Sequence, residues 1–189
     1  MTAQFEAAWE IHSFLSDYKT PYVIIGGFAV QYWGEPRFTR DVDVIAAVPL
    51  GKDKNFVQLI VKDFTPRVQN IINFACQTRV IPVRAQNGCE IDITLSIPGY
   101  EDQVIEQSID YELEPGKVVR LCSAEDLIIH KAVAGRPRDC QDIEGVVYRQ
   151  RDSLKTKYIR TWLKEFALVL EDPEVVDRFE QPWHKLHSR

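Results

Sequence analysis

The sequence has no apolar run long enough to cross a membrane, and its N-terminus lacks the basic-then-apolar order of a signal peptide. We therefore expect a cytoplasmic protein without a membrane partner. No internal repeat or low-complexity tract is present. The 189 residues suffice for one domain, or one domain with a small helical extension, and a hydrophobic fraction of 45% can supply a sizeable core.

The spacing of the cysteines excludes the usual zinc motifs. The four cysteines are far apart and form no Cys-x-x-Cys pair. A zinc site is therefore not expected. We interpret these residues as reduced, buried small hydrophobes: Cys76, Cys89, Cys122 and Cys140.

An excess of positive charge is absent as well. The net charge of −5 argues against general attraction to nucleic acid. The stretch from Lys131 to Lys164 differs, because it holds nine Lys and Arg residues against four acids, a local excess of five positive charges. Such a stripe can contact phosphates, although a solvated helix face is the commoner explanation.

The chain is organised around a strand, a glycine pair and a helix. Tyr22 to Ile25 is a compact apolar run rich in β-branched residues, which favours a buried strand. Gly26 and Gly27 end it and allow a sharp turn close to a ligand. Apolar residues then recur at helical spacing: Phe28, Ala29, Tyr32 and Trp33. The glycines therefore lie at a helix N-terminus, where free N–H groups and the helix dipole favour a phosphate.

A pair of aspartates follows in a second strand. Asp41 and Asp43 share one face of this strand, and two valines share the other. At roughly 6 Å and an effective dielectric near 20, the two carboxylates repel by about 3 kcal/mol. A divalent cation removes this repulsion, and carboxylate oxygens suit Mg²⁺. A solvated strand face is the alternative for Asp-x-Asp alone, but the glycine turn upstream favours the metal site.

These two features together resemble a known signature. Gly26-Gly27, thirteen intervening residues and then Asp41-Val42-Asp43-Val44 look like the motif of the DNA polymerase β-type nucleotidyltransferase superfamily. The fuller run, Pro36-Arg37-Phe38-Thr39-Arg40-Asp41-Val42-Asp43, resembles the bacterial branch that includes the AbiEii-type toxins. The resemblance implies an α/β fold, a two-ion Mg²⁺ site and an NTP substrate. It also implies nucleotide contacts from Arg37, Thr39 and Arg40.

In the resembled family a third carboxylate lies on a later strand, next to the Asp-x-Asp strand, and draws the proton from the attacking hydroxyl. Residues 79–84 and 90–95 are predicted to be a strand pair joined by a turn. Glu90 and Asp92 lie on one face of the second strand. We choose Asp92, because Ile91 and Ile93 flank it as valines flank Asp43. Glu90 is the alternative for this role, and an exposed hairpin face is the non-functional interpretation.

Two further residues come from the resemblance alone. Lys131 and the following stretch to Asp142 resemble a Lys…Asp element of the AbiEii-like branch, which implies that Lys131 contacts phosphate and Asp139 supports the active site. The residues themselves favour structural roles. Lys131 lies near the apolar side of its helix, where lysines usually extend to solvent. After a Gly135 C-cap, Asp139 suits the N-cap of the next helix.

The expected fold is α/β: a polymerase β-like mixed sheet with flanking helices and a helical C-terminal region. Residues 1–122 form the nucleotidyltransferase core, and residues 123–189 form the helical region, packed on the core as one unit. Beyond those already described, the pattern predicts helices at 4–18, 55–62, 67–75, 102–108, 154–170 and 173–187, and short strands at 110–113 and 118–121.

The resulting hypothesis is a Mg²⁺-dependent nucleotidyltransferase that moves an NMP from an NTP to an acceptor hydroxyl. The AbiEii-like resemblance implies RNA, a tRNA end included, in a toxin–antitoxin or phage-defence setting with an antitoxin partner protein. A small-molecule acceptor and a protein hydroxyl remain open. The alternative function is a non-catalytic nucleotide- or RNA-binding regulatory protein of the same fold. A purely structural interpretation, with solvated acids and plain turns, requires several coincidences.

Overall fold

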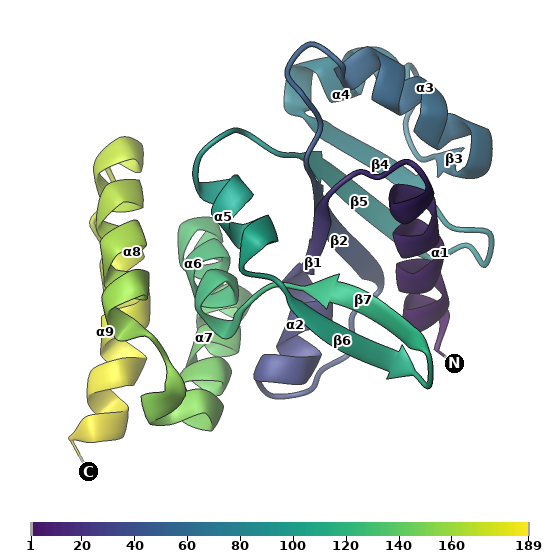
Figure 1. Ribbon diagram of the computed structural model, residues 1–189. Coiled ribbons are helices and arrows are strands. Elements are labelled where there is room, and N and C mark those ends of the chain that lie inside the picture. The colour runs from purple at the N-terminus through teal and green to yellow at the C-terminus, as the bar shows by residue number, and fades with distance from the viewer. Residues whose placement is uncertain (1, 189) are drawn as a thin grey trace. The chain divides into compact units, whose positions relative to one another are not determined.

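The computed structural model describes residues 2–188, which form two compact units (Figure 1). The first unit contains the residues up to Phe28 together with Phe38–Cys122. The second contains Ala29–Arg37 and the residues from Ser123 onward. The first unit holds the β-sheet, and the second is helical.

The sheet of the first unit is mixed, as the sequence predicts. Its strands are β1 (Tyr22–Ile25), β2 (Asp41–Ala46), β3 (Thr65–Pro66), β4 (Val80–Arg84), β5 (Glu90–Leu95), β6 (Ile109–Glu114) and β7 (Lys117–Leu121). Their order is β3-β4-β5-β2-β1-β7-β6. The pairs β2–β5 and β1–β7 are parallel, and the other neighbours are antiparallel.

Strands β1, β2 and β5 form the centre of the sheet. Val42, Val44, Ile91 and Ile93 are fully buried on one face, as the alternation of side chains along a strand requires. Because β2 and β5 run parallel in register, the acids between these residues all emerge on the opposite face. The centre of the sheet therefore has one apolar face and one acidic face.

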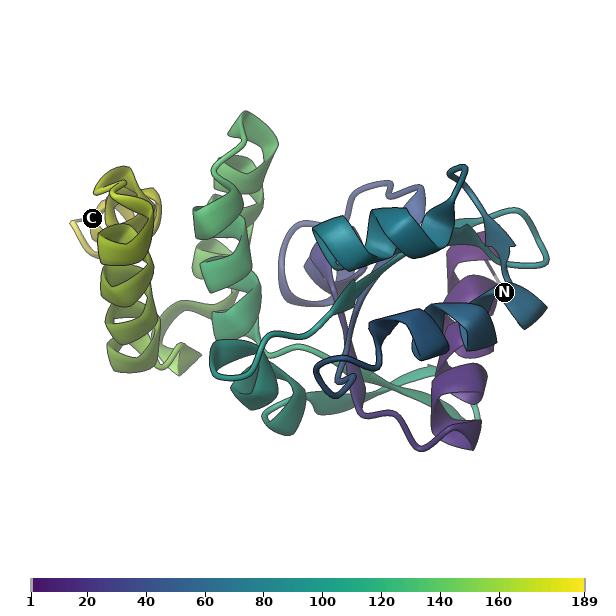
Figure 2. The ribbon, with the colours of Figure 1, turned by 90° about the horizontal axis from the view of Figure 1, so that it is seen from above.

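Helices flank this sheet within the first unit. They are α1 (Ala3–Asp17), α3 (Asp53–Asp63), α4 (Ile71–Thr78) and α5 (Tyr100–Glu106), and α2 (Gly26–Trp33) begins here and continues into the second unit. Helix α1 lies across the sheet and contacts β2 and β7 (Figure 1). Helices α3 and α4 lie side by side next to β3 and β4 (Figures 1 and 2). The predicted helices are thus confirmed, with shifted ends.

One of these shifts changes the position of Arg67. The sequence predicts a helix from about Arg67, but α4 begins only at Ile71. Thr65 and Pro66 pair with β4 instead, and the Arg67 amide donates to the Pro82 carbonyl at 3.0 Å. Tertiary pairing therefore holds Arg67 in a loop, and its side chain is available to the acidic face of the sheet.

The second unit consists of helices α6 (Ala124–Ala134), α7 (Pro137–Gln150), α8 (Thr156–Leu170) and α9 (Glu174–His187), with the 3₁₀ turn η1 (Arg151–Ser153). Helices α8 and α9 pack side by side (Figure 2). Gly135 caps α6 with a left-handed backbone, as predicted. Asp139 is not the N-cap of α7, however. Because Pro137 takes the first helical position, Arg136 is the cap, and Asp139 lies three residues later.

The cysteines form no disulfide within the described chain, and one prediction about them is wrong. Cys89 and Cys122 are buried and Cys140 is partly buried, but Cys76 is exposed on α4. No helix between residues 2 and 188 is both long and apolar enough to cross a bilayer.

Candidate active site

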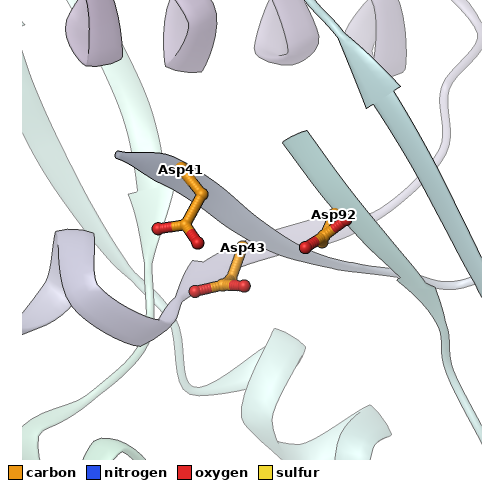
Figure 3. A group of neighbouring side chains, drawn as sticks. All are labelled: Asp41, Asp43 and Asp92. Carbon is orange, nitrogen blue, oxygen red and sulfur yellow. The ribbon is translucent and has the colours of Figure 1, made fainter. Parts of the chain in front are cut away.

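The acidic face of the sheet brings three predicted site residues together. Asp41 and Asp43 come from β2, and Asp92 comes from β5, directly opposite Asp43 in the parallel register. One carboxylate oxygen from each lies within 4.8 Å of the others. Figure 3 shows the three side chains on the same side of their strands. The parallel pairing of β2 with β5 thus builds a cluster of oxygens from acids about fifty residues apart.

The structure also distinguishes Asp92 from Glu90. Glu90 lies opposite Asp41 in the register, but its carboxylate pairs with Arg84 at 3.0 Å and with Arg67 at 3.1 Å. It is not part of the three-oxygen cluster. The geometry therefore favours Asp92 as the third carboxylate.

Asp92 has an unusual electrostatic environment. Burial raises the pKa of its carboxyl group, and the charges of Asp41 and Glu90 raise it further. Arg67 opposes this effect, because its Nη1 donates to Asp92 Oδ1 at 2.6 Å. The net pKa is above the ordinary value.

The glycine turn lies beside this cluster. Strand β1 ends at Ile25, which is paired with Asp43, and α2 begins at Gly26. Gly26 has a φ of +67°, and a Cβ atom there would lie 1.9 Å from Asp43 Oδ2. Only glycine permits both the left-handed backbone and this close approach. The N-terminal end of α2, with its free N–H groups, is thus adjacent to the carboxylates.

The three expected nucleotide contacts before β2 lie in different environments. Thr39 is 5% exposed, and its hydroxyl donates to Asp41 Oδ1 at 2.7 Å, which orients that carboxylate. Arg40 is exposed. Arg37 belongs to the second unit, where its Nε and Nη2 donate to the two oxygens of Asp142, each at 2.7 Å.

Lys131 and Asp139 belong to the same buried network of the second unit. Lys131 Nζ lies 2.8 Å from Asp139 Oδ1 and 2.9 Å from Asp142 Oδ2. Arg136 also belongs to the network, because its Nε lies 2.6 Å from Asp139 Oδ2. The side chains of Lys131, Asp139 and Asp142 are at most 8% exposed. This network fixes the Arg37 segment to helices α6 and α7.

The network makes the stability of the folded protein depend on pH in the acidic range. Burial raises the pKa of Asp139 and of Asp142, but hydrogen bonds and positive charges from Lys131, Arg136 and Arg37 outweigh it, so both pKa values are lowered. The folded protein therefore holds these protons more weakly than the unfolded chain, whose Asp pKa is about 3.9. Their stabilisation is complete above about pH 5 and is lost as the pH falls through the lowered pKa values.

We expect Asp142→Asn to lower the free energy of unfolding by about 3 kcal/mol at pH 7, because it leaves the buried Lys131 and the partly buried Arg37 short of a partner. The loss should shrink as the pH falls below about 4, because the unfolded chain then takes up the Asp142 proton more readily than the folded protein does. Urea unfolding followed by circular dichroism from pH 3 to 7 measures both effects. Asp152→Asn is the matched control, because that side chain is 86% exposed. Equal losses in the two variants at pH 7 would contradict the stabilising role of the network.

Sequence reasoning missed Arg67, which contacts two acids of the candidate site. Its pairing with Asp92 depends on the β3–β4 ladder, which no local pattern reveals. It also did not reveal that Arg160, counted in the basic stripe, pairs with Glu180, an acid outside that stretch. Part of the predicted positive excess is therefore neutralised within the protein.

The donor set fits a divalent cation with oxygen ligands. Asp41, Asp43 and Asp92 each offer one oxygen to a common point, and carboxylate oxygens are the ligands that Mg²⁺ prefers. The absence of a Cβ at Gly26 lets the Asp43 carboxylate lie directly against the turn. An anion-binding helix end next to a cation site is an arrangement suited to a metal-bound phosphate.

A mixed sheet with flanking helices and this acidic cluster defines the fold as nucleotidyltransferase-like. Residues 3–189 match the family described as "Nucleotidyltransferase of unknown function (DUF6036)", and the chain belongs to that family. No curated protein matches the sequence.

Solved structures share the fold. An antigenic nucleotidyltransferase-like protein from Paracoccidioides brasiliensis is 20% identical, with a TM-score of 0.53 over 92% of this chain and 90% of that one. ANT(2'')-Ia in complex with adenylyl-2''-tobramycin is 15% identical, with a TM-score of 0.51 over 86% of this chain and 98% of that one. At these identities the likeness concerns the fold alone.

Proposed function

We propose that this protein is a metal-dependent nucleotidyltransferase that moves an NMP from an NTP to an acceptor hydroxyl. The observation that carries the proposal is the convergence of Asp41, Asp43 and Asp92 beside the Gly26 turn. Membership in a family of nucleotidyltransferases supports it. Asp41, Asp43 and Asp92 would hold Mg²⁺, as a two-ion site. When bound, Mg²⁺ would polarise the phosphoryl oxygens and neutralise the charge of the triphosphate.

The residues of the chain then have distinct tasks. The amides at Gly26 and Gly27 bind the triphosphate, and exposed Arg40 adds a positive charge. Thr39 holds Asp41 in place. The oxygen of the acceptor hydroxyl forms a bond to the α-phosphorus, and Asp92 accepts the proton that this hydroxyl loses. The bond from that phosphorus to the bridging oxygen breaks, and pyrophosphate leaves with the electron pair.

Lys131, Asp139 and Arg37 are proposed to support the site rather than to react. Arg37 precedes Thr39 by two residues and is anchored by Asp142, which Lys131 also holds. The network therefore restrains the segment that enters β2. A phosphate contact by Lys131, which the AbiEii-like resemblance implies, would compete with two close carboxylates.

For the acceptor we propose RNA, a tRNA end included, on the AbiEii-like resemblance, which also implies a toxin–antitoxin or phage-defence setting and an antitoxin partner. A small-molecule acceptor is the second candidate. The fold shared with ANT(2'')-Ia in complex with adenylyl-2''-tobramycin favours it.

The test is incubation with each α-³²P-labelled NTP, Mg²⁺ and a cellular RNA, protein or small-molecule pool. We expect label to move from one NTP to an acceptor in the unmodified protein and not in Asp41→Ala/Asp43→Ala. Absence of transfer to every pool with every NTP would contradict the proposal. Metal-dependent NTP binding without transfer would favour the non-catalytic binding protein.

The contact between Arg67 and Asp92 can be tested by mutation. Arg67→Gln leaves Asp92 without its cationic partner, so the transfer rate should fall roughly 10- to 100-fold, the range expected for hydrogen bonds to charged groups. Arg67→Lys should recover part of the rate. Steady-state rates under saturating NTP measure both. Arg84→Gln is the control, since Arg84 pairs with Glu90 and not with Asp92. An effect of the control as large as that of Arg67→Gln would oppose a role through Asp92.

A further inference from the structure

The second unit carries a basic surface with an aromatic ring, and the proposed transfer step does not use it. This surface, here called the Tyr148 platform, runs from the end of α7 through η1 into the first turn of α8. Its members are all exposed: Tyr148, Arg149, Arg151, Lys155 and Lys157. Residues 148–157 hold four Lys and Arg residues against one acid, in a chain whose net charge is −5. Positive charge is thus concentrated here.

This charge is not neutralised by nearby acids. Among residues 2–188, the side chains of Arg151, Lys155 and Lys157 form no ion pair, whereas Arg160 in the same unit pairs with Glu180. Helix α8 has no acidic residue in its first turn. Its positive end therefore adds to the field of the lysines. The positive charges of these three side chains can therefore pair with the phosphates or carboxylates of an anionic partner.

The ring lies at the edge of a hollow of about 490 Å³ lined by Glu35, Pro36, Tyr148, Arg149 and Arg151. Tyr148 is 54% exposed, and Arg151 Cζ lies 5.2 Å from the centre of its ring. Aromatic rings and guanidinium planes are the surfaces on which unpaired bases stack. Backbone phosphates then require cations at intervals along the strand. The platform supplies both components.

We propose that the Tyr148 platform binds single-stranded nucleic acid. A base stacks on Tyr148 and Arg151, while Arg149, Lys155 and Lys157 contact phosphates. A duplex is a poorer ligand, because stacking between neighbouring base pairs covers its base faces. An acidic protein would form ion pairs with the cations but would leave the ring of Tyr148 without a stacking partner. The inference rests on the proposed function and deepens it, because it makes a nucleic acid strand the acceptor class.

The test is fluorescence anisotropy with a 5′-labelled 12-nucleotide RNA, the same sequence as DNA, and a hairpin duplex, without any NTP. We expect the RNA strand to bind more tightly than the duplex. Tyr148→Ala should weaken binding roughly 5- to 100-fold. Lys155→Gln/Lys157→Gln should lower the slope of log K against log salt by about 1.4. Lys52→Gln/Lys54→Gln, with the same charge change on exposed residues of the first unit, should change binding little.

Three results would overturn the inference: no binding of either strand at low salt, preference for the duplex, or equal weakening by the two lysine pairs. Comparison of RNA with DNA identifies which strand is the ligand. The Asp41→Ala/Asp43→Ala protein should bind RNA as tightly as the unmodified protein. Strand binding without transfer would contradict the proposed nucleotidyl transfer alone. Transfer to a small molecule without strand binding would contradict this inference and the RNA acceptor, and would leave nucleotidyl transfer itself in place.

Discussion

Asp43→Asn is expected to lower the rate of nucleotidyl transfer by about 10³-fold or more. Asp43 lies at the centre of the cluster, paired with Ile25 of β1 on one side and Asp92 of β5 on the other. Its loss removes a ligand from the proposed metal site, whose charge stabilisation is worth several kcal/mol. The fold should tolerate the change, because it relieves repulsion among three carboxylates. Single-turnover transfer of labelled NMP measures the effect, with thermal unfolding as the check on folding.

Glu90→Gln is the matched control for Asp43→Asn. Glu90 lies on the same face of the sheet, but its carboxylate pairs with Arg84 and Arg67 outside the cluster. We expect it to retain transfer within about tenfold, the effect of losing one charged hydrogen bond. If Glu90→Gln abolishes transfer while Asp92→Asn preserves it, Glu90 rather than Asp92 is the third carboxylate.

Gly26→Ala is expected to have the second largest effect. The new Cβ would lie 1.9 Å from Asp43 Oδ2, so that Asp43 must move. The φ of +67° adds a backbone cost of about 1 to 2 kcal/mol for any residue with a Cβ. We therefore expect a lower free energy of unfolding and a loss of transfer about as large as that of Asp43→Asn. Urea unfolding and the transfer assay together measure the two effects.

Gly88→Ala separates the backbone cost from the displacement of Asp43. Gly88 has a φ of +84°, but its Cβ would meet nothing within 4 Å. This variant should lose about 1 to 2 kcal/mol of stability and keep its transfer rate. If Gly26→Ala also keeps its transfer rate, the turn does not position Asp43 for the reaction.

Local sequence patterns predicted most of the fold. The apolar run of β1, the glycine turn and the helical spacing after it are local signals, and β1 begins and ends where predicted. The alternation on β2 and β5 is also a local pattern, whereas the mixed sheet was expected from the family resemblance. Gly135 as a C-cap is correct. The position of Asp139 is not, since the prediction did not give Pro137 the first position of α7.

Long-range pairing accounts for what the sequence did not reveal. The alternation placed Glu90 and Asp92 on one face, but only the register of β5 against β2 brings Asp92 to Asp43. Arg67 reaches Asp92 because β3 pairs with β4. The Arg37 segment joins the helical unit through an ion pair with Asp142, 105 residues away. None of these contacts leaves a periodic pattern in the chain, and the catalytic roles themselves remain predictions.

The most direct test of the account is Mn²⁺ binding followed by electron paramagnetic resonance, in which the signal of free Mn²⁺ decreases as the ion binds. The unmodified protein, titrated with and without a non-hydrolysable NTP, is expected to bind Mn²⁺ more tightly when the nucleotide is present. Asp41→Asn/Asp43→Asn should lose this binding while unfolding at a similar or higher temperature. Equal Mn²⁺ affinity in the two proteins would show that Asp41, Asp43 and Asp92 do not form the metal site.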